Sequence, residues 1–108
     1  MIRGGAVRVP VASVASAVRF YIETLGMKLV EERPAESIID AGEGFLLALR
    51  AGTERLRGGV ELHAKVPLAQ AIAIYENRGV VFDASGRFED PDGNAFTLVE
   101  SSSYGMPY

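Results

Sequence analysis

Hydrophobic and polar residues alternate along several short stretches of this chain, as expected for β-strands that bury one face. In residues 6–11 (AVRVPV) and 60–66 (VELHAKV) every second residue is apolar. Turns rich in glycine, such as the one at 42–44, separate these stretches. The pattern predicts strands at residues 6–11, 27–33, 37–41, 45–51, 60–66, 80–84, 86–90 and 94–100.

Two segments show helical spacing instead, with apolar residues that return every three or four positions. Residues 13–26 begin with Ser13, a good N-cap, and end at Gly26, where a helix C-cap belongs. Residues 67–79 have a proline in the first turn and a glycine after the end. Both segments are therefore predicted to be α-helices.

The predicted elements occur twice in the same order, as a strand, a helix and three further strands. This order predicts an α+β fold made of two βαβββ units, residues 1–55 and 56–108, in a single domain. The strands are expected to form a curved mixed sheet with the helices on its convex face. The concave face is left open for a binding site.

Composition narrows the possible partners and location. The net charge is −3 and no basic block is present, so a nucleic-acid partner is not expected. The absence of cysteine excludes disulfides and thiolate metal sites. The N-terminus does not resemble a signal peptide, and no apolar run reaches the roughly 18 residues that span a bilayer. We predict a soluble cytoplasmic protein without a membrane partner.

Two motifs carry a family resemblance. Residues 11–27 contain Phe20-Tyr21 followed by Leu25-Gly26, and residues 88–100 read FEDPDGNAFTLVE. These motifs resemble the first helix and the closing hairpin of the vicinal oxygen chelate superfamily, which includes glyoxalases, bleomycin-resistance proteins and extradiol dioxygenases. The paired βαβββ units match its architecture over nearly the whole chain. We expect the first motif to pack a helix onto a sheet and DPDGN to form a turn.

In metal-dependent members, the resemblance implies four ligand positions, usually His or Gln, Glu, His and Glu. In this chain they fall on Ala6, on one residue within Leu46–Ala48, on Glu61 and on Thr97. Only Glu61 coordinates metals well, and one carboxylate is too few for a site that needs three or four protein ligands. We therefore predict no metal and no other cofactor. The alternative is a shifted metal site around Glu61 and His63.

Strand alternation also predicts which side chains line the concave face: Arg8, Arg50, Glu61, His63, Lys65 and Thr97. We interpret them as a mixed-charge, metal-free pocket for a small anionic or zwitterionic molecule, with arginine as the clamp for its carboxylate or phosphate. Alternatively, they are ordinary charges on a solvated sheet face. His63 and Glu61 are also the candidates for a catalytic acid–base pair, although no nucleophile motif accompanies them.

The resemblance and the missing ligands favour a small-molecule binding protein of the bleomycin-resistance type. The resemblance further implies a homodimer, with pockets where halves of two chains meet. Two other functions stay open. One is a metal-dependent lyase, isomerase or dioxygenase with the shifted site, and the other is a non-catalytic interaction or regulatory module.

Overall fold

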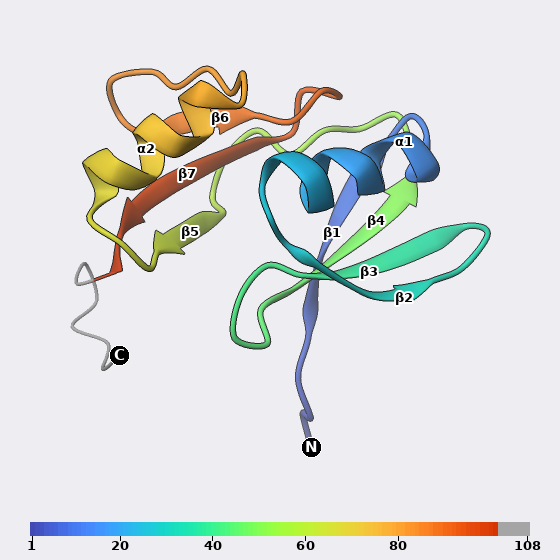
Figure 1. The fold of residues 1–108 in the computed structure, drawn as a ribbon. Helices are drawn as coiled ribbons and strands as arrows, with labels where there is room; N and C mark the ends of the chain where they lie inside the picture. Colours follow the sequence, from blue (N-terminus) through green and yellow to red (C-terminus); the bar gives the residue numbers. More distant parts are fainter. Residues whose placement is uncertain (102–108) are drawn as a thin grey trace.

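The computed structural model of the protein describes residues 1–101. In chain order the elements are β1 (Ala6–Val11), α1 (Val14–Arg19), the π-helical turn η1 (Phe20–Thr24), β2 (Lys28–Glu32), β3 (Glu36–Asp40), β4 (Leu46–Ala51), β5 (Glu61–Ala64), α2 (Leu68–Asn77), β6 (Arg87–Glu89) and β7 (Ala95–Glu100) (Figure 1). Neither helix in this part of the chain is long and apolar enough to cross a bilayer.

The strands form two mixed sheets with related topologies. The first has the order β1-β4-β3-β2, and the second has the order β5-β7-β6. In each sheet the first strand pairs in parallel with the last strand of its half, and the other pairs are antiparallel. Helix α1 covers one face of the first sheet and α2 covers one face of the second (Figure 1). The predicted α+β fold is confirmed, but the strands form two mixed sheets where one curved sheet was predicted.

The strand predicted at 80–84 does not form, so this prediction is wrong. The Asp83 carboxylate accepts hydrogen bonds from the backbone N–H groups of Ser85 (2.8 Å) and Arg87 (3.0 Å), and from the Ser85 hydroxyl (2.6 Å). The Ser85 hydrogen bond is the main reason that the pKa of Asp83 is lowered. These local bonds turn the chain where a strand would continue, because they compete with ladder pairing. The side chain of Val81 is consequently 82% exposed.

Both predicted helices form, and their ends follow the expected chemistry. The hydroxyl of Ser13 accepts a hydrogen bond from the Ser16 N–H at 3.4 Å and caps α1. The helix continues through η1, where the Leu25 N–H donates to the Phe20 carbonyl at 3.1 Å. Gly26 then ends it with a φ of 73°, a left-handed conformation that glycine adopts without steric cost.

One cluster of buried residues draws on both halves of the chain. Its centre contains three aromatic rings: Phe88 stacks on Phe96 at 5.7 Å, and Phe96 meets Tyr21 edge to face at 6.2 Å. Tyr21 comes from η1 in the first half, whereas the two phenylalanines come from β6 and β7. The first motif therefore packs as predicted, although its tyrosine reaches across to the second half.

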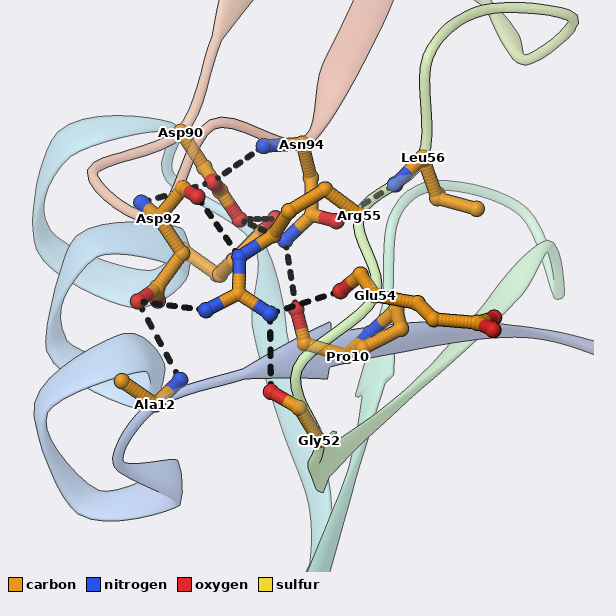
Figure 2. A network of polar contacts seen from close by, with 10 residues as sticks. Pro10, Ala12, Gly52, Glu54, Arg55, Leu56, Asp90, Asp92 and Asn94 are labelled. Carbon is orange, nitrogen blue, oxygen red and sulfur yellow. Dashed lines mark hydrogen bonds and ion pairs between the residues drawn. The ribbon is translucent and has the colours of Figure 1, made fainter.

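The DPDGN segment, which we call the Asp90 turn (residues 90–94), does more than reverse the chain (Figure 2). The Asp90 carboxylate is buried and accepts hydrogen bonds from the Tyr21 hydroxyl (2.6 Å) and from the Asn94 side chain (2.9 Å). It also accepts from the backbone N–H groups of Asp92 (2.9 Å) and Asn94 (2.8 Å). Four donors within residues 1–101 thus satisfy the buried carboxylate.

The same turn binds the start of the chain and the linker. The Asn94 side chain donates to the carbonyl of Pro10 at 2.8 Å and accepts from the N–H of Leu56, also at 2.8 Å. Asp92 accepts from the N–H of Ala12 at 3.1 Å, and its carbonyl accepts from Arg55 at 2.7 Å (Figure 2). The Asp90 turn therefore joins the first half, the linker and the second half.

Tyr21 gives this network a predicted pH dependence. Burial, and then the charge and hydrogen bond of Asp90, raise the pKa of Tyr21 above its ordinary value of 10.0. Above pH 10 the unfolded chain ionises Tyr21 while the folded chain does not. The free energy of unfolding should therefore be unaffected below that pH and fall above it, by up to about 1.4 kcal/mol per pH unit.

Urea denaturation between about pH 9 and pH 11 measures this slope. The Tyr21→Phe variant should lose part of it. Tyr75→Phe is the matched control for a second, half-buried tyrosine, because burial also raises the pKa of Tyr75. An alkaline slope in Tyr21→Phe equal to that of the wild type would contradict the prediction.

Candidate functional site

A cleft of about 930 Å³ lies between the two halves. One wall comes from β5, α2 and neighbouring residues. The other wall comes from residues 25–28, where η1 passes into β2, and from the β3–β4 hairpin at residues 40–45. Pockets that bind drug-sized molecules usually measure roughly 300–1,000 Å³ and often lie between structural units. Size and position therefore make this cleft the candidate binding site.

The inner part of the cleft is apolar. Ala64, Phe88 and Leu98 line it and are themselves buried, whereas Phe45 and Ile74 are each 40% exposed. Strand alternation turns Ala64 inward, and the helical repeat brings Ile74 to the same side of α2 as other lining residues. The sequence pattern thus produces a site with an apolar floor and two large apolar side chains accessible to a ligand.

The side chains of Tyr75 and Arg78 connect the two walls of the cleft through hydrogen bonds. The Tyr75 hydroxyl donates to the carbonyl of Leu25 at 2.7 Å, and the Arg78 guanidinium donates to the carbonyl of Thr24 at 2.9 Å. These carbonyls lie at the end of the first helix, where intrahelical partners run out. Arg78 also lies over the Tyr75 ring, 5.8 Å from its centre. The contacts fix the spacing of the walls at this end of the cleft.

Charged residues of both signs line the cleft. The cationic ones are Lys28, Lys65 and Arg78, and the acidic ones are Asp40, Glu43 and Glu61. Asp40 is already used within the hairpin, where its carboxylate accepts hydrogen bonds from the N–H groups of Gly42 (2.7 Å) and Gly44 (3.3 Å). The lining can therefore hold an apolar molecule that carries charged groups.

Of the six residues predicted for a concave pocket, the structure places three around the cleft and three outside its lining. Glu61, His63 and Lys65 are among the residues that line the cleft, although alternation turns them to the face of the strand opposite Ala64. Arg8 and Arg50 lie on the first sheet and are not part of its lining, and Arg50 forms an ion pair with Glu36 at 2.8 Å.

Thr97 pairs with Glu61 in the second sheet but is not part of the cleft lining. Sequence reasoning missed Tyr75, Arg78, Glu43 and Phe45, which do line the cleft. Their positions depend on how the two halves pack, and no local pattern marks them.

Comparison with known proteins identifies the fold to which this structure is similar. No protein-family model matches the sequence, and no curated protein matches it. Solved structures do match. TnmS3, an antibiotic-binding protein from Streptomyces sp. CB03234, has a TM-score of 0.77 at 24% identity, covering 93% of this chain and 96% of its own. A glyoxalase/bleomycin resistance protein/dioxygenase superfamily member from Sphaerobacter thermophilus has a TM-score of 0.75 at 23% identity, covering 93% and 98%. The bleomycin-binding protein of Streptomyces verticillus, complexed with copper(II)-bleomycin, has a TM-score of 0.66 at 17% identity, covering 93% and 97%.

The chain has the vicinal oxygen chelate fold. With the fold in place, the four ligand positions that the resemblance implies can be located. The register pairs Ala6 with Leu46 in the first sheet and Glu61 with Thr97 in the second. The two pairs are equivalent, so the second position, left open within Leu46–Ala48, corresponds to Leu46.

The chain does not supply the full set of donors that a divalent metal needs at those positions. Alanine and leucine offer no ligand atom, and Thr97 has only a neutral hydroxyl. Within residues 1–101, no three His, Asp or Glu side chains gather closely enough to hold a metal ion. The residues present therefore do not fit the metal of the superfamily's enzymes.

Proposed function

We propose that this protein binds a drug-sized, partly apolar small molecule in the cleft between its halves and requires no metal to do so. The observation that carries the proposal is the cleft itself, with an apolar floor and charged side chains in its lining. Burial of the apolar part of a ligand would provide most of the binding free energy, and the charged groups would provide orientation.

The structural neighbours support the ligand class without deciding it. Two of them are described as an antibiotic-binding protein and a bleomycin-binding protein. At 24% and 17% identity their likeness extends to the fold alone, and one fold hosts many functions. For this chain, the cleft is therefore the main support for a binding function. The donor set at Ala6, Leu46, Glu61 and Thr97 supports binding without a metal.

Thermal-shift titration of the purified protein tests the proposal. Bleomycin and a panel of aromatic compounds of different charge would be added with and without a chelator. A ligand at 100 times its Kd should stabilise the fold by about 2.7 kcal/mol. We expect at least one compound to give a saturable shift that the chelator leaves unchanged. Shifts that appear only after zinc, nickel, manganese or ferrous iron is added would contradict the proposal.

A homodimer is part of the same proposal, with the chain folded as one domain in the cytoplasm. The face of the first sheet opposite α1 carries Arg8 beside Ala48, with Ile38 and Leu46 on the same side. A second copy could cover these apolar side chains and leave the arginine at the edge. Light scattering should give about twice the monomer mass of 11.6 kDa. A monomer at high protein concentration would contradict this part.

A further inference from the structure

The tip of the β3–β4 hairpin has an unusual backbone. Gly42, Glu43 and Gly44 have φ angles of 145°, 50° and 87°. Within residues 1–101, Glu43 is the one residue other than glycine with a positive φ. The Cβ atom makes this left-handed region unfavourable for glutamate, whereas glycine adopts it readily. A residue held in such a conformation at a binding site is a reason to look for a role of its side chain.

The hairpin does not depend on the glutamate side chain for its shape. Asp40 accepts the hydrogen bonds from the Gly42 and Gly44 N–H groups, and Ala41 pairs with Phe45 through a backbone bond of 2.8 Å. The surroundings are open, since a Cβ atom added at either flanking glycine would meet nothing within 4 Å. Glycine at position 43 would therefore keep the turn and relieve the strain.

Glu43 lies where a carboxylate can act on a ligand. Both Glu43 and Phe45 line the cleft, and Phe45 is 40% exposed. Among the other charges of the lining, Asp40 is bonded to the hairpin amides and Arg78 is bonded to the carbonyl of Thr24. The hairpin thus presents an aromatic residue next to an anionic group, and the cation of the same wall, Lys28, is paired in register with Asp40 in the β2–β3 ladder.

We propose that Glu43 is a specificity-determining residue that binds a positively charged group of an aromatic ligand, while the ligand's rings pack against Phe45. This inference rests on the proposed binding function of the cleft and names the class of ligand. A carboxylate only accepts hydrogen bonds, and the exposed Glu43 would attract a cation more strongly once a bound ligand and the apolar lining exclude water from it. The net charge of −3 also attracts cations to the protein.

Two fluorescent aromatic dyes of opposite charge test the inference: thioflavin T, a cation, and 8-anilinonaphthalene-1-sulfonate, an anion. Glu43→Gln keeps the strained backbone and removes the charge. We expect it to raise the Kd of thioflavin T by about five- to tenfold, leave the Kd of the anionic dye unchanged or lower, and leave Tm unchanged. Glu43→Gly should weaken thioflavin T to the same extent while raising Tm by about 2–5 °C.

The matched control is Glu32→Gln, which removes an exposed carboxylate from β2 outside the cleft and should change neither Kd. If both dyes bind and Glu43→Gln leaves the thioflavin T affinity at the wild-type value, the inference is wrong and the proposed function stands. If neither dye binds the wild type saturably, both are wrong. A fall in Tm for Glu43→Gly would overturn the strain argument.

Discussion

Replacement of Asp90 by alanine is expected to lower the free energy of unfolding by about 3–4 kcal/mol, because several buried donors lose their acceptor together. The Tyr21 hydroxyl, the Asn94 side chain and two backbone N–H groups all donate to this carboxylate. Tyr21 and Asn94 are fully buried, so water cannot easily replace the lost acceptor. Urea denaturation followed by circular dichroism measures the loss.

Asp83→Ala is the matched control for this substitution. Asp83 also closes a turn by accepting hydrogen bonds from Ser85 and Arg87, but its side chain is exposed and, within residues 1–101, bonds only to these near neighbours. We expect a much smaller loss of stability, since water can solvate the freed donors. Equal losses in the two variants would mean that the Asp90 turn acts only as a local turn.

The Asp90 turn also shows how far sequence reasoning extends. Asp, Pro, Gly and Asn in DPDGN predicted a turn, and the positive φ of Gly93 (91°) is what that chemistry requires. The partners of the turn were not predictable, because Tyr21 lies 69 residues away in sequence. Local rules specify local geometry, whereas a contact across the fold depends on how the two halves pack.

The same distinction explains the one strand that was predicted wrongly. Residues 80–84 do show alternation, with Val80 buried and Val81 exposed. Alternation reports one buried face and says nothing about whether a neighbouring strand supplies a ladder. The hydrogen bonds from Ser85 and Arg87 to Asp83 end the segment before such a ladder develops.

The candidate site was predictable only in part for a related reason. Alternation marked Glu61, His63 and Lys65 as one face of a strand, and all three are among the residues around the cleft, but the floor of the cleft comes from Ala64 on the opposite face of that strand. The other wall depends on where the β3–β4 hairpin and the end of η1 lie relative to α2. Tyr75 and Arg78 set that placement by donating to the backbone carbonyls of Leu25 and Thr24. Every residue has a backbone carbonyl, so the sequence does not indicate which ones act as acceptors.

Replacement of Ile74 by aspartate should abolish binding in the cleft with little effect on the fold. Ile74 lines the cleft and is 40% exposed, so the new carboxylate would stay partly hydrated in the free protein and lose water when a ligand packs against it. We expect the Kd of both thioflavin T and 8-anilinonaphthalene-1-sulfonate to rise by at least about tenfold. Unfolding free energy should change by no more than about 1 kcal/mol.

Ala73→Asp is the matched control, because it introduces the same side chain into the same helix at an exposed neighbouring position outside the cleft. It carries the helix penalty of aspartate and should leave both affinities at the wild-type value. A loss of both dyes in Ile74→Asp alone would assign binding to the cleft, and comparison with Glu43→Gln would separate its apolar part from its charged part. If Ile74→Asp and Ala73→Asp bind the dyes alike, the ligand lies elsewhere, and the open faces of the two sheets become the next surfaces to test.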